Sequence, residues 1–188
     1  LMTFLNEDLG SVQAQVGRLA LATATLVNEQ HRLGVDLTGT PGADFFVPPA
    51  AAASLAAPSN AGTGQFTATV IDATALIASD YEIRTDATGT SIVRLSDNQS
   101  TPVAAFPVDI DGLRFTLDSG AVASGDRYRL RPFEAVARNL SVAIGAPDRL
   151  AAASPVMVSP ATTNAGGLSI ERLYATGPVG SPIPSVDI

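Results

Sequence analysis

Residues 3–33, TFLNEDLGSVQAQVGRLALATATLVNEQHRL, carry the clearest periodic pattern of the chain, in which mostly apolar side chains recur alternately four and three residues apart. The recurring positions form a heptad seam: Leu5, Leu9, Val12, Val16, Leu19, Thr23, Leu26 and Gln30. A seam with a spacing of about 3.5 residues is buried when another helix packs against it at a shallow angle. The pattern therefore predicts a long helix of the coiled-coil type, and we expect its partner helix to lie outside these 188 residues.

The predicted helix ends in glycine-rich sequence. Gly34 stands where a helix C-terminal cap is expected, and residues 39–42 add two further glycines and a proline. Two adjacent aromatic residues, Phe45 and Phe46, follow. We expect at least one ring to pack back onto the helix end, because exposing both would forgo the burial of a large apolar surface.

Composition excludes several classes of protein. The 11 basic residues are all arginine and the net charge is −7, which disfavours binding to a phosphate backbone, so we expect no nucleic-acid partner. The absence of cysteine and the presence of one histidine remove disulfide scaffolds, thiolate metal sites and zinc sites with two imidazoles. No apolar run approaches the roughly 20 residues of a membrane span, and the N-terminus lacks a signal-peptide pattern. We therefore expect no membrane partner.

The hydrophobic period changes to two between Gln65 and Ile144, which is typical of short strands. We predict an α+β fold in which the long helix precedes a small antiparallel β-sandwich or a partly closed barrel. The predicted domains are the end of a helical domain (1–47), an Ala/Pro/Gly linker (48–64), a β-domain (65–153) and a Pro/Gly-rich connection or start of an inserted domain (154–188). Because it runs from Leu1 to a Pro-rich stretch ending at Ile188, the chain is expected to be a piece of a longer one.

No group of residues predicts catalysis, a metal site or a cofactor site. The one imidazole, His31, has no nucleophile or orienting group among its sequence neighbours, so we interpret it as structural, favoured at the last helical turn by the helix dipole and the terminal carbonyls. Asp109 and Asp111 lack the closing carboxylate of a calcium loop and favour a turn before a strand. Arginines at 127, 129 and 131 on one strand face are interpreted as a solvated surface.

Two stretches resemble the bacterial flagellar hook-associated protein 1 family. The first is residues 19–46, LALATATLVNEQHRLGVDLTGTPGADFF, where an Ala-rich helix ends in a characteristic series of residues. The residues that match are Asn28, His31, Gly34, Asp36, Gly39, Gly42, Phe45 and Phe46. The second resembles the β-domain of that family over residues 71–73, 80–83, 93–96, 111–113 and 125–132.

The resemblance implies a structural subunit, not an enzyme, that joins hook to filament as a mechanical adaptor ring. The implied partners are copies of itself, the hook protein, the second junction protein or filament subunits, and a flagellar export chaperone. The implied location is the extracellular flagellum, reached through the flagellar type III apparatus without a cleaved signal peptide. We consider two alternatives: another flagellar axial protein, such as flagellin or the second junction protein, and a secreted adhesin or binding module.

Two sets of residues are predicted to carry the structural role. The helix seam is assigned to Leu5, Leu9, Val12, Val16, Leu19 and Leu26. The helix end and the domain hinge are assigned to Asn28, His31, Gly34, Phe45 and Phe46.

Overall fold

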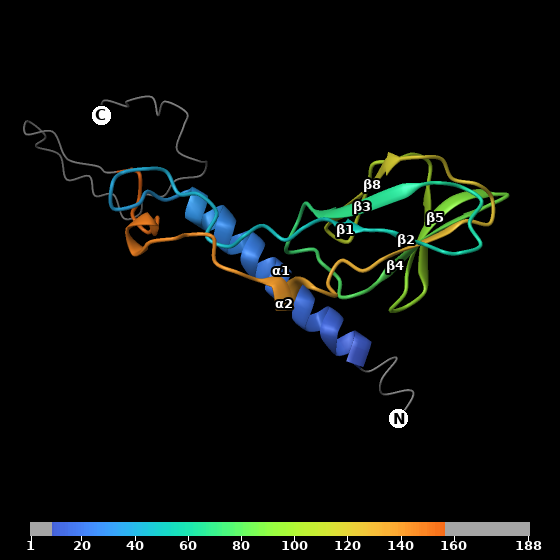
Figure 1. Cartoon of the computed structure of the whole chain (residues 1–188), viewed down its shortest axis with the longest axis horizontal. Helices are drawn as coiled ribbons and strands as arrows, with labels where there is room; N and C mark the ends of the chain where they lie inside the picture. The colour runs from blue at the N-terminus through green and yellow to red at the C-terminus, as the bar shows by residue number, and fades with distance from the viewer. Residues whose placement is uncertain (1–8, 157–188) are drawn as a thin grey trace, which may run out of the picture. The chain divides into compact units, whose positions relative to one another are not determined.

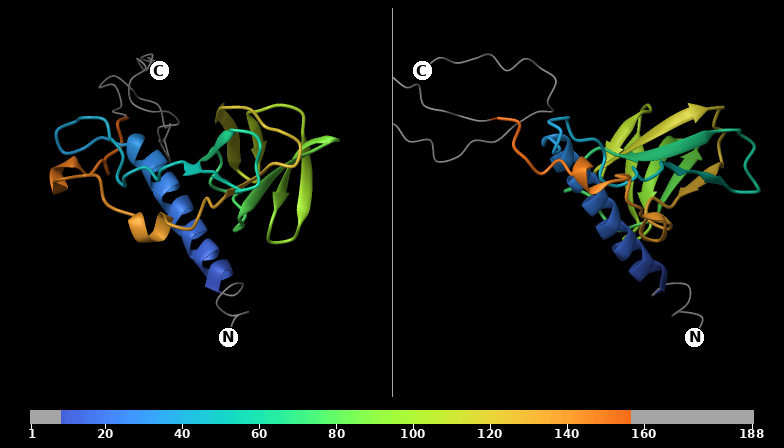
Figure 2. Two further views of the ribbon diagram at one scale, coloured as in Figure 1. Left: turned by 45° about the vertical axis from the view of Figure 1, so that its right-hand side comes forward. Right: turned by 60° about the vertical axis from the view of Figure 1, so that its left-hand side comes forward.

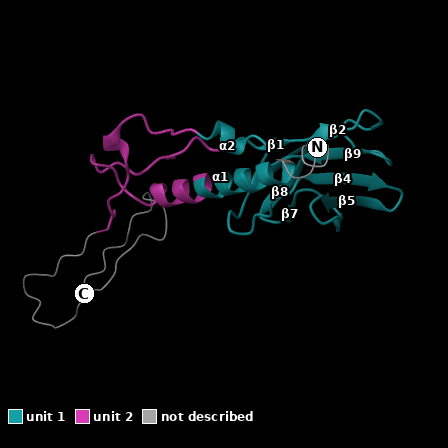
Figure 3. Cartoon of the chain, turned by 90° about the horizontal axis from the view of Figure 1, so that it is seen from below, with its two compact units in different colours: residues 1–23, 49–140 teal, residues 24–48, 141–188 magenta. Residues whose placement is uncertain are grey.

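The computed structural model describes residues 9–156, which fall into two compact units, coloured separately in Figure 3. The first unit holds the described residues up to Thr23 together with residues 49–140. The second holds residues 24–48 and the described residues from Ser141 onward. The predicted seam residue Leu5 and residues 157–188 of the predicted C-terminal connection lie outside the described residues.

Helix α1 (Leu9–Arg32) is the long helix that the heptad spacing predicts (Figure 1). Its sequence is rich in alanine, leucine and glutamine and contains no proline, a composition that favours a helix. The helix closes with a tight turn, because the N–H groups of Leu33 and Gly34 bond to the carbonyls of Gln30 and His31, three residues back. The predicted helix end near Leu33 is confirmed.

Helix α1 presents two different stripes of side chains. One stripe is buried or half-buried: Ala14, Gly17, Leu21, Ala24, Asn28 and His31. The described members of the heptad seam are exposed by 54% at Val12, 51% at Val16, 65% at Leu19 and 45% at Leu26, and we call these four residues the exposed stripe. At about 100° per residue the two stripes are centred roughly 150° apart, so they point to nearly opposite sides of the helix.

The first unit contains two antiparallel sheets (Figure 2). The four-stranded sheet has the order β1 (Ala52–Ala53), β3 (Gln65–Val70), β8 (Leu113–Ser119) and β7 (Val108–Ile110). The five-stranded sheet has the order β2 (Leu55–Ala56), β9 (Arg127–Leu130), β4 (Tyr81–Asp86), β5 (Gly89–Arg94) and β6 (Gln99–Val103). The described residues thus form an α+β fold with two separate sheets, and a closed barrel is absent from this part of the chain.

The two sheets share one core, built by the alternate residues of each strand. Aromatic rings meet across it: Phe66 and Tyr128 have ring centroids 5.0 Å apart, and Tyr81 and Phe115 have centroids 5.2 Å apart. The other fully buried side chains of this core include Ile83, Ile92, Leu113, Leu130 and Phe133. Period-two alternation buries one face of each sheet, which gives the two-layer arrangement of a sandwich.

The first half of α1 packs within the first unit. Leu21 belongs to the sandwich core, and the Arg18 guanidinium donates a hydrogen bond to the carbonyl of Leu76. A Cβ atom on Gly17 would lie 2.0 Å from the carbonyl oxygen of Phe133, so only glycine allows this close approach of the helix. The short helix α2 (Val136–Asn139) follows Phe133.

The structure differs from the sequence prediction at residues 48–64, predicted as a linker. Strands β1 and β2 lie in this segment and pair with β3 and β9. The segment that follows is held by the Asp126 carboxylate, which accepts hydrogen bonds from the N–H groups of Ala61, Gly62 and Ala123 and from the Tyr128 hydroxyl. A sequence of small, uncharged residues is therefore built into the sheets by main-chain pairing, which composition does not reveal.

The second difference concerns the end of the predicted β-domain. Residues 141–153 belong to the second unit, together with the C-terminal half of α1 and the segment after it. At the end of the stretch with a period of two, which runs to Ile144, there is one bridge, between Val142 and Phe46. The 3-10 helix η2 (Pro147–Arg149) follows.

Candidate functional site

The residues predicted to mark the helix end come together in the second unit. Asn28 and His31 lie one turn apart on the buried stripe of α1, and Gly34 follows the helix. Phe45 and Phe46 lie on the segment that follows the glycine-rich loop, and residues 141–153 pass beside both parts. We call this arrangement the helix-end junction.

Asn28 joins α1 to the main chain of Phe46. Its side-chain Nδ2 donates to the Phe46 carbonyl at 2.9 Å, and its Oδ1 accepts from the Phe46 N–H at 2.8 Å. The side chain thus pairs with Phe46 as a neighbouring strand would, and it is buried. An amide is the one neutral side-chain group that supplies a donor and an acceptor in this geometry, which explains asparagine here.

His31 joins α1 to two further segments. Its Nδ1 lies 2.5 Å from the carbonyl oxygen of Ala43, and its Nε2 accepts a hydrogen bond from the Ala151 N–H at 2.9 Å. These partners assign the proton of the neutral ring to Nδ1, because a carbonyl only accepts and an N–H only donates. The ring lies on the buried stripe, and its partners are these main-chain groups and not the terminal carbonyls of the helix.

Two glycines allow the three segments to approach closely. A Cβ atom on Gly34 would lie 2.2 Å from the carbonyl oxygen of Ala151, and one on Gly42 would lie 1.9 Å from the carbonyl oxygen of His31. Neither glycine has a positive φ, so the requirement is space and not backbone conformation.

The paired aromatic residues close the junction. The Phe45 ring lies edge-on to the His31 ring with centroids 5.7 Å apart, and the Phe46 ring lies edge-on to Phe45 at 4.8 Å. This arrangement meets the expectation that one ring packs back onto the helix end. The neighbouring main chain is tied down as well, because Phe45 and Val47 exchange hydrogen bonds with residues 141–143.

Charged groups surround the junction without forming a catalytic set. Arg32 pairs with Asp44, and Asp36 holds the turn after the helix by accepting from the Thr38 hydroxyl and from the N–H groups of Thr38 and Thr40. The Thr38 hydroxyl, followed by the Thr40 N–H, lowers the pKa of Asp36 below its ordinary value. Among residues 9–156 there is no group of three or more His, Asp or Glu side chains that could hold a metal.

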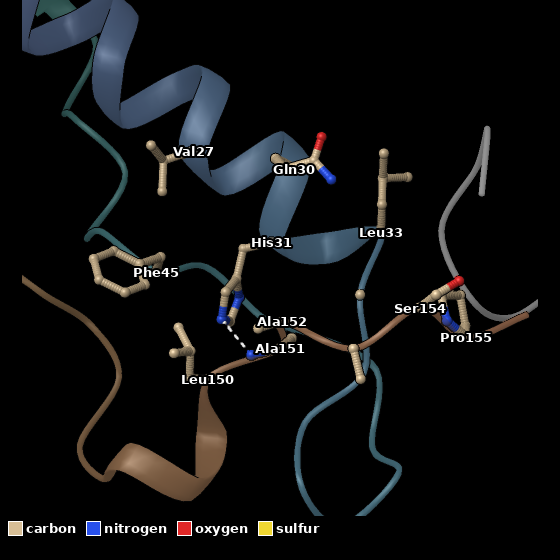
Figure 4. Close-up of a pocket in the computed structure, with 12 residues that line it drawn as sticks. Val27, Gln30, His31, Leu33, Phe45, Leu150, Ala151, Ala152, Ser154 and Pro155 are labelled. Carbon is tan, nitrogen blue, oxygen red and sulfur yellow. Dashed lines mark hydrogen bonds between the residues drawn. The ribbon is translucent and has the colours of Figure 1, made fainter. Parts of the chain in front are cut away.

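A cavity of about 630 Å³ lies beside the junction. Figure 4 shows His31 projecting from α1 to Ala151, with Phe45 and Leu150 on the same side of the cavity. Its walls are mainly apolar, and both nitrogens of the imidazole are occupied by main-chain groups. The imidazole therefore holds chain segments together at this cavity.

The other sequence candidates are ion-paired on the sheets. Arg129 and Arg131 lie near Asp80, at 2.8 and 3.7 Å, and Arg127 lies 3.5 Å from Glu82, so this face is a network of opposite charges. Asp109 pairs with Arg114 on the neighbouring strand.

Asp111 lies in the turn before β8, where it accepts hydrogen bonds from Arg94 and from the Tyr81 hydroxyl. These carboxylates are thus engaged by arginine or tyrosine, in line with the interpretation of a turn before a strand.

Sequence reasoning missed the partners of the predicted residues. Ala43 and Ala151 supply only main-chain groups, and Ala151 is 120 positions away from His31 along the chain. No side-chain pattern could identify them. Buried Asp126 was also missed, although its place between turn residues and a β-strand is a usual one for a carboxylate that accepts main-chain N–H groups.

Comparisons with known proteins agree with both parts of the chain. Residues 1–46 match the family described as "Flagellar hook-associated protein FlgK helical domain", and residues 55–132 match "Flagellar hook-associated protein 1, D2-like domain". The chain is 36% identical over 157 residues to flagellar hook-associated protein 1 of Escherichia coli (strain K12), covering 82% of this chain and 28% of that protein. The corresponding protein of Salmonella typhimurium is 34% identical over 170 residues, covering 85% and 29%.

A solved structure has the same fold. It is described as the flagellar hook junction protein FlgK from Burkholderia pseudomallei, and it matches with a TM-score of 0.69 and 30% identity over 78% of this chain and 27% of that one. These relatives are components of the bacterial flagellum. The chain belongs to the flagellar hook-associated protein 1 family, and it spans less than a third of the length of the curated relatives it matches.

No helix among residues 9–156 has the length and apolar character that crossing a membrane requires.

Proposed function

We propose that this protein is a structural subunit that joins the hook to the filament of the bacterial flagellum as a mechanical adaptor ring. The observation that carries the proposal is that two different domains of one family match this chain, one over the helix and one over most of the sheets. The solved relative is itself described as a hook junction protein. The role requires rigid parts and specific contacts, and no chemistry.

The proposed partners are copies of this protein in a ring, the hook protein, and the second junction protein or filament subunits. We also propose that a flagellar export chaperone binds this protein. Its proposed route out of the cell is the flagellar type III apparatus, without a cleaved signal peptide. Family membership supports these partners and this route, since the relatives are flagellar components.

The exposed stripe of α1 is the surface that we assign to helix pairing. Val12, Val16, Leu19 and Leu26 repeat at heptad spacing and are each about half exposed or more. An apolar stripe of this kind is stable in water only when a second helix covers it, and a shallow crossing angle fits its spacing. In this proposal a coiled-coil contact made by another helix of the assembly covers the stripe.

We assign to the helix-end junction the role of fixing the direction that the chain takes after α1. Asn28, His31 and Phe45 each link the helix to a segment that follows it. We propose that these residues, with Gly34 and Phe46, act as the hinge between the helix and the sheets that follow in the sequence.

The test is immunogold electron microscopy of flagellated cells with antibodies raised against this chain. A band of label between hook and filament is expected. Label along the whole filament would instead favour a flagellin, and label on the cell body would favour an adhesin.

The role of the exposed stripe is tested with Val16→Asp combined with Leu19→Asp. This variant should lose the junction label, while its folded stability stays within about 1 kcal/mol because both side chains are exposed. Gln13→Asp, an exposed position off the stripe, is the matched control and should retain the label.

A further inference from the structure

The segment that returns to the helix end, residues 148–153, is held by two kinds of links. Three main-chain hydrogen bonds join it to the loop after α1: Val35 N–H to the Ala153 carbonyl at 2.9 Å, Ala153 N–H to the Val35 carbonyl at 3.2 Å, and Leu37 N–H to the Asp148 carbonyl at 3.2 Å. Within the described residues, the one hydrogen bond from α1 itself to this segment is that between Ala151 N–H and His31 Nε2.

This hydrogen bond depends on the protonation state of the ring. Nε2 accepts from Ala151 only while it carries a lone pair, and Nδ1 carries the ring proton toward Ala43. A proton taken from solvent at Nε2 would place two N–H groups against each other at this contact. The Nδ1 hydrogen bond to Ala43 would remain and would be strengthened by the positive charge.

The hydrogen-bond partners of the His31 ring are main-chain groups, although charged side chains lie on the elements around it. The charged residues on the elements around His31 are Glu29, Arg32, Asp36, Asp44, Asp148 and Arg149. Arg32 is paired with Asp44, and Arg149 lies 3.9 Å from Asp36. In the described part of the chain none of these groups is hydrogen-bonded to the imidazole. Protonation of the ring therefore acts on its hydrogen bonds with Ala43 and Ala151.

We propose that His31 is a proton-sensitive clasp, which holds residues 150–152 against α1 when the ring is neutral and releases them when it is charged. Release is local, because the bonds between Val35 and Ala153 do not involve the ring. It opens one wall of the cavity, since Leu150, Ala151 and Ala152 line it.

The test is amide hydrogen exchange followed residue by residue by NMR on the 188-residue chain, corrected for the intrinsic effect of pH. His31 is the sole histidine, so its ring titration is followed without ambiguity in the same samples. Over the pH range in which the ring signals show that it gains its second proton, the Ala151 amide should exchange about tenfold faster, the change expected for the loss of one hydrogen bond. The amides of Ala153 and Phe46, bonded to Val35 and Asn28, should change by less than about twofold.

His31→Gln is the matched variant, because its side-chain amide carries a donor and an acceptor but does not titrate. It should remove the pH dependence at Ala151. The clasp is refuted if the Ala151 amide is unaffected across the ring titration, or if Ala151, Ala153 and Phe46 accelerate together, which would indicate general unfolding. It is also refuted if His31→Gln keeps the pH effect. The three wild-type amides decide the question by themselves if the variant does not fold.

Discussion

Replacing Asn28 tests whether one side chain holds the helix-end junction. Asn28→Ala removes two hydrogen bonds, of 2.8 and 2.9 Å, and leaves the N–H and the carbonyl of Phe46 without their partner. An unsatisfied buried group costs about 1–3 kcal/mol, and we take the lower half of that range because Phe46 is half-buried and water reaches part of it. Alanine has a higher helix propensity than asparagine, which offsets roughly 0.6 kcal/mol of this loss. The two groups together cost about 2–4 kcal/mol, so the expected loss in the free energy of unfolding is about 1.4–3.4 kcal/mol.

Asn28→Asp separates the hydrogen-bonding explanation from loss of volume. The introduced carboxylate has nearly the shape of the amide and still accepts from the Phe46 N–H, but its second oxygen faces the Phe46 carbonyl and repels it. Protonation restores a donor at that oxygen, so the folded state raises the pKa of the introduced carboxyl. The loss of stability should therefore be largest near neutral pH and should shrink as the pH falls through that raised value.

The assay is urea unfolding followed by far-UV circular dichroism, which reports the long helix. Glu29→Ala is the control, since Glu29 is the exposed neighbour of Asn28 and its replacement should change stability by less than about 0.5 kcal/mol. The reasoning is refuted if Asn28→Ala costs no more than this control, or if the loss in Asn28→Asp is the same at every pH.

Two further predictions concern the first unit. The hydrogen bond from the Ala123 N–H, followed by those from Gly62, Tyr128 and Ala61, holds the pKa of Asp126 below its ordinary value against the opposing effect of burial. Its ionised form therefore stabilises the fold above about pH 4, and this contribution is lost as the pH falls through the lowered value. Asp126→Asn should lower Tm near neutral pH, and its difference from wild type should narrow in acid; a constant difference in a Tm-against-pH series would contradict this role. Gly17→Ala places a Cβ atom 2.0 Å from the Phe133 carbonyl oxygen and should cost about 1–3 kcal/mol, whereas Gly10→Ala, with nothing within 4 Å, should gain about 0.5–1 kcal/mol. Equal effects of the two substitutions in urea unfolding would show that α1 does not pack closely at Gly17.

The elements that carry a local period could be predicted from the sequence. The repeat in residues 3–33 predicts α1, and the alternation around Tyr81 and Leu113 predicts strands β4 and β8. The α+β class follows from these periods. The structure confirms the α+β class. Where the sequence left a sandwich and a partly closed barrel open, the described residues form two separate sheets.

Elements made of small residues could not be predicted in the same way. Strands β1 and β2 consist of Ala52–Ala53 and Leu55–Ala56, too short and too uniform to show a period. Their strand character comes from pairing with β3 and β9, which lie further along the chain. A segment whose structure is imposed by distant partners carries little signal of its own.

The helix and its apolar repeat can be predicted from the sequence, because periodicity is a property of neighbouring residues. The tertiary structure shows which side of α1 is buried: of its two stripes, the one made mostly of small and polar residues is covered. It also decided the partners of Asn28 and His31, which are main-chain groups of Phe46, Ala43 and Ala151. Every residue carries such groups, so a contact made through the main chain leaves no mark in the side-chain sequence.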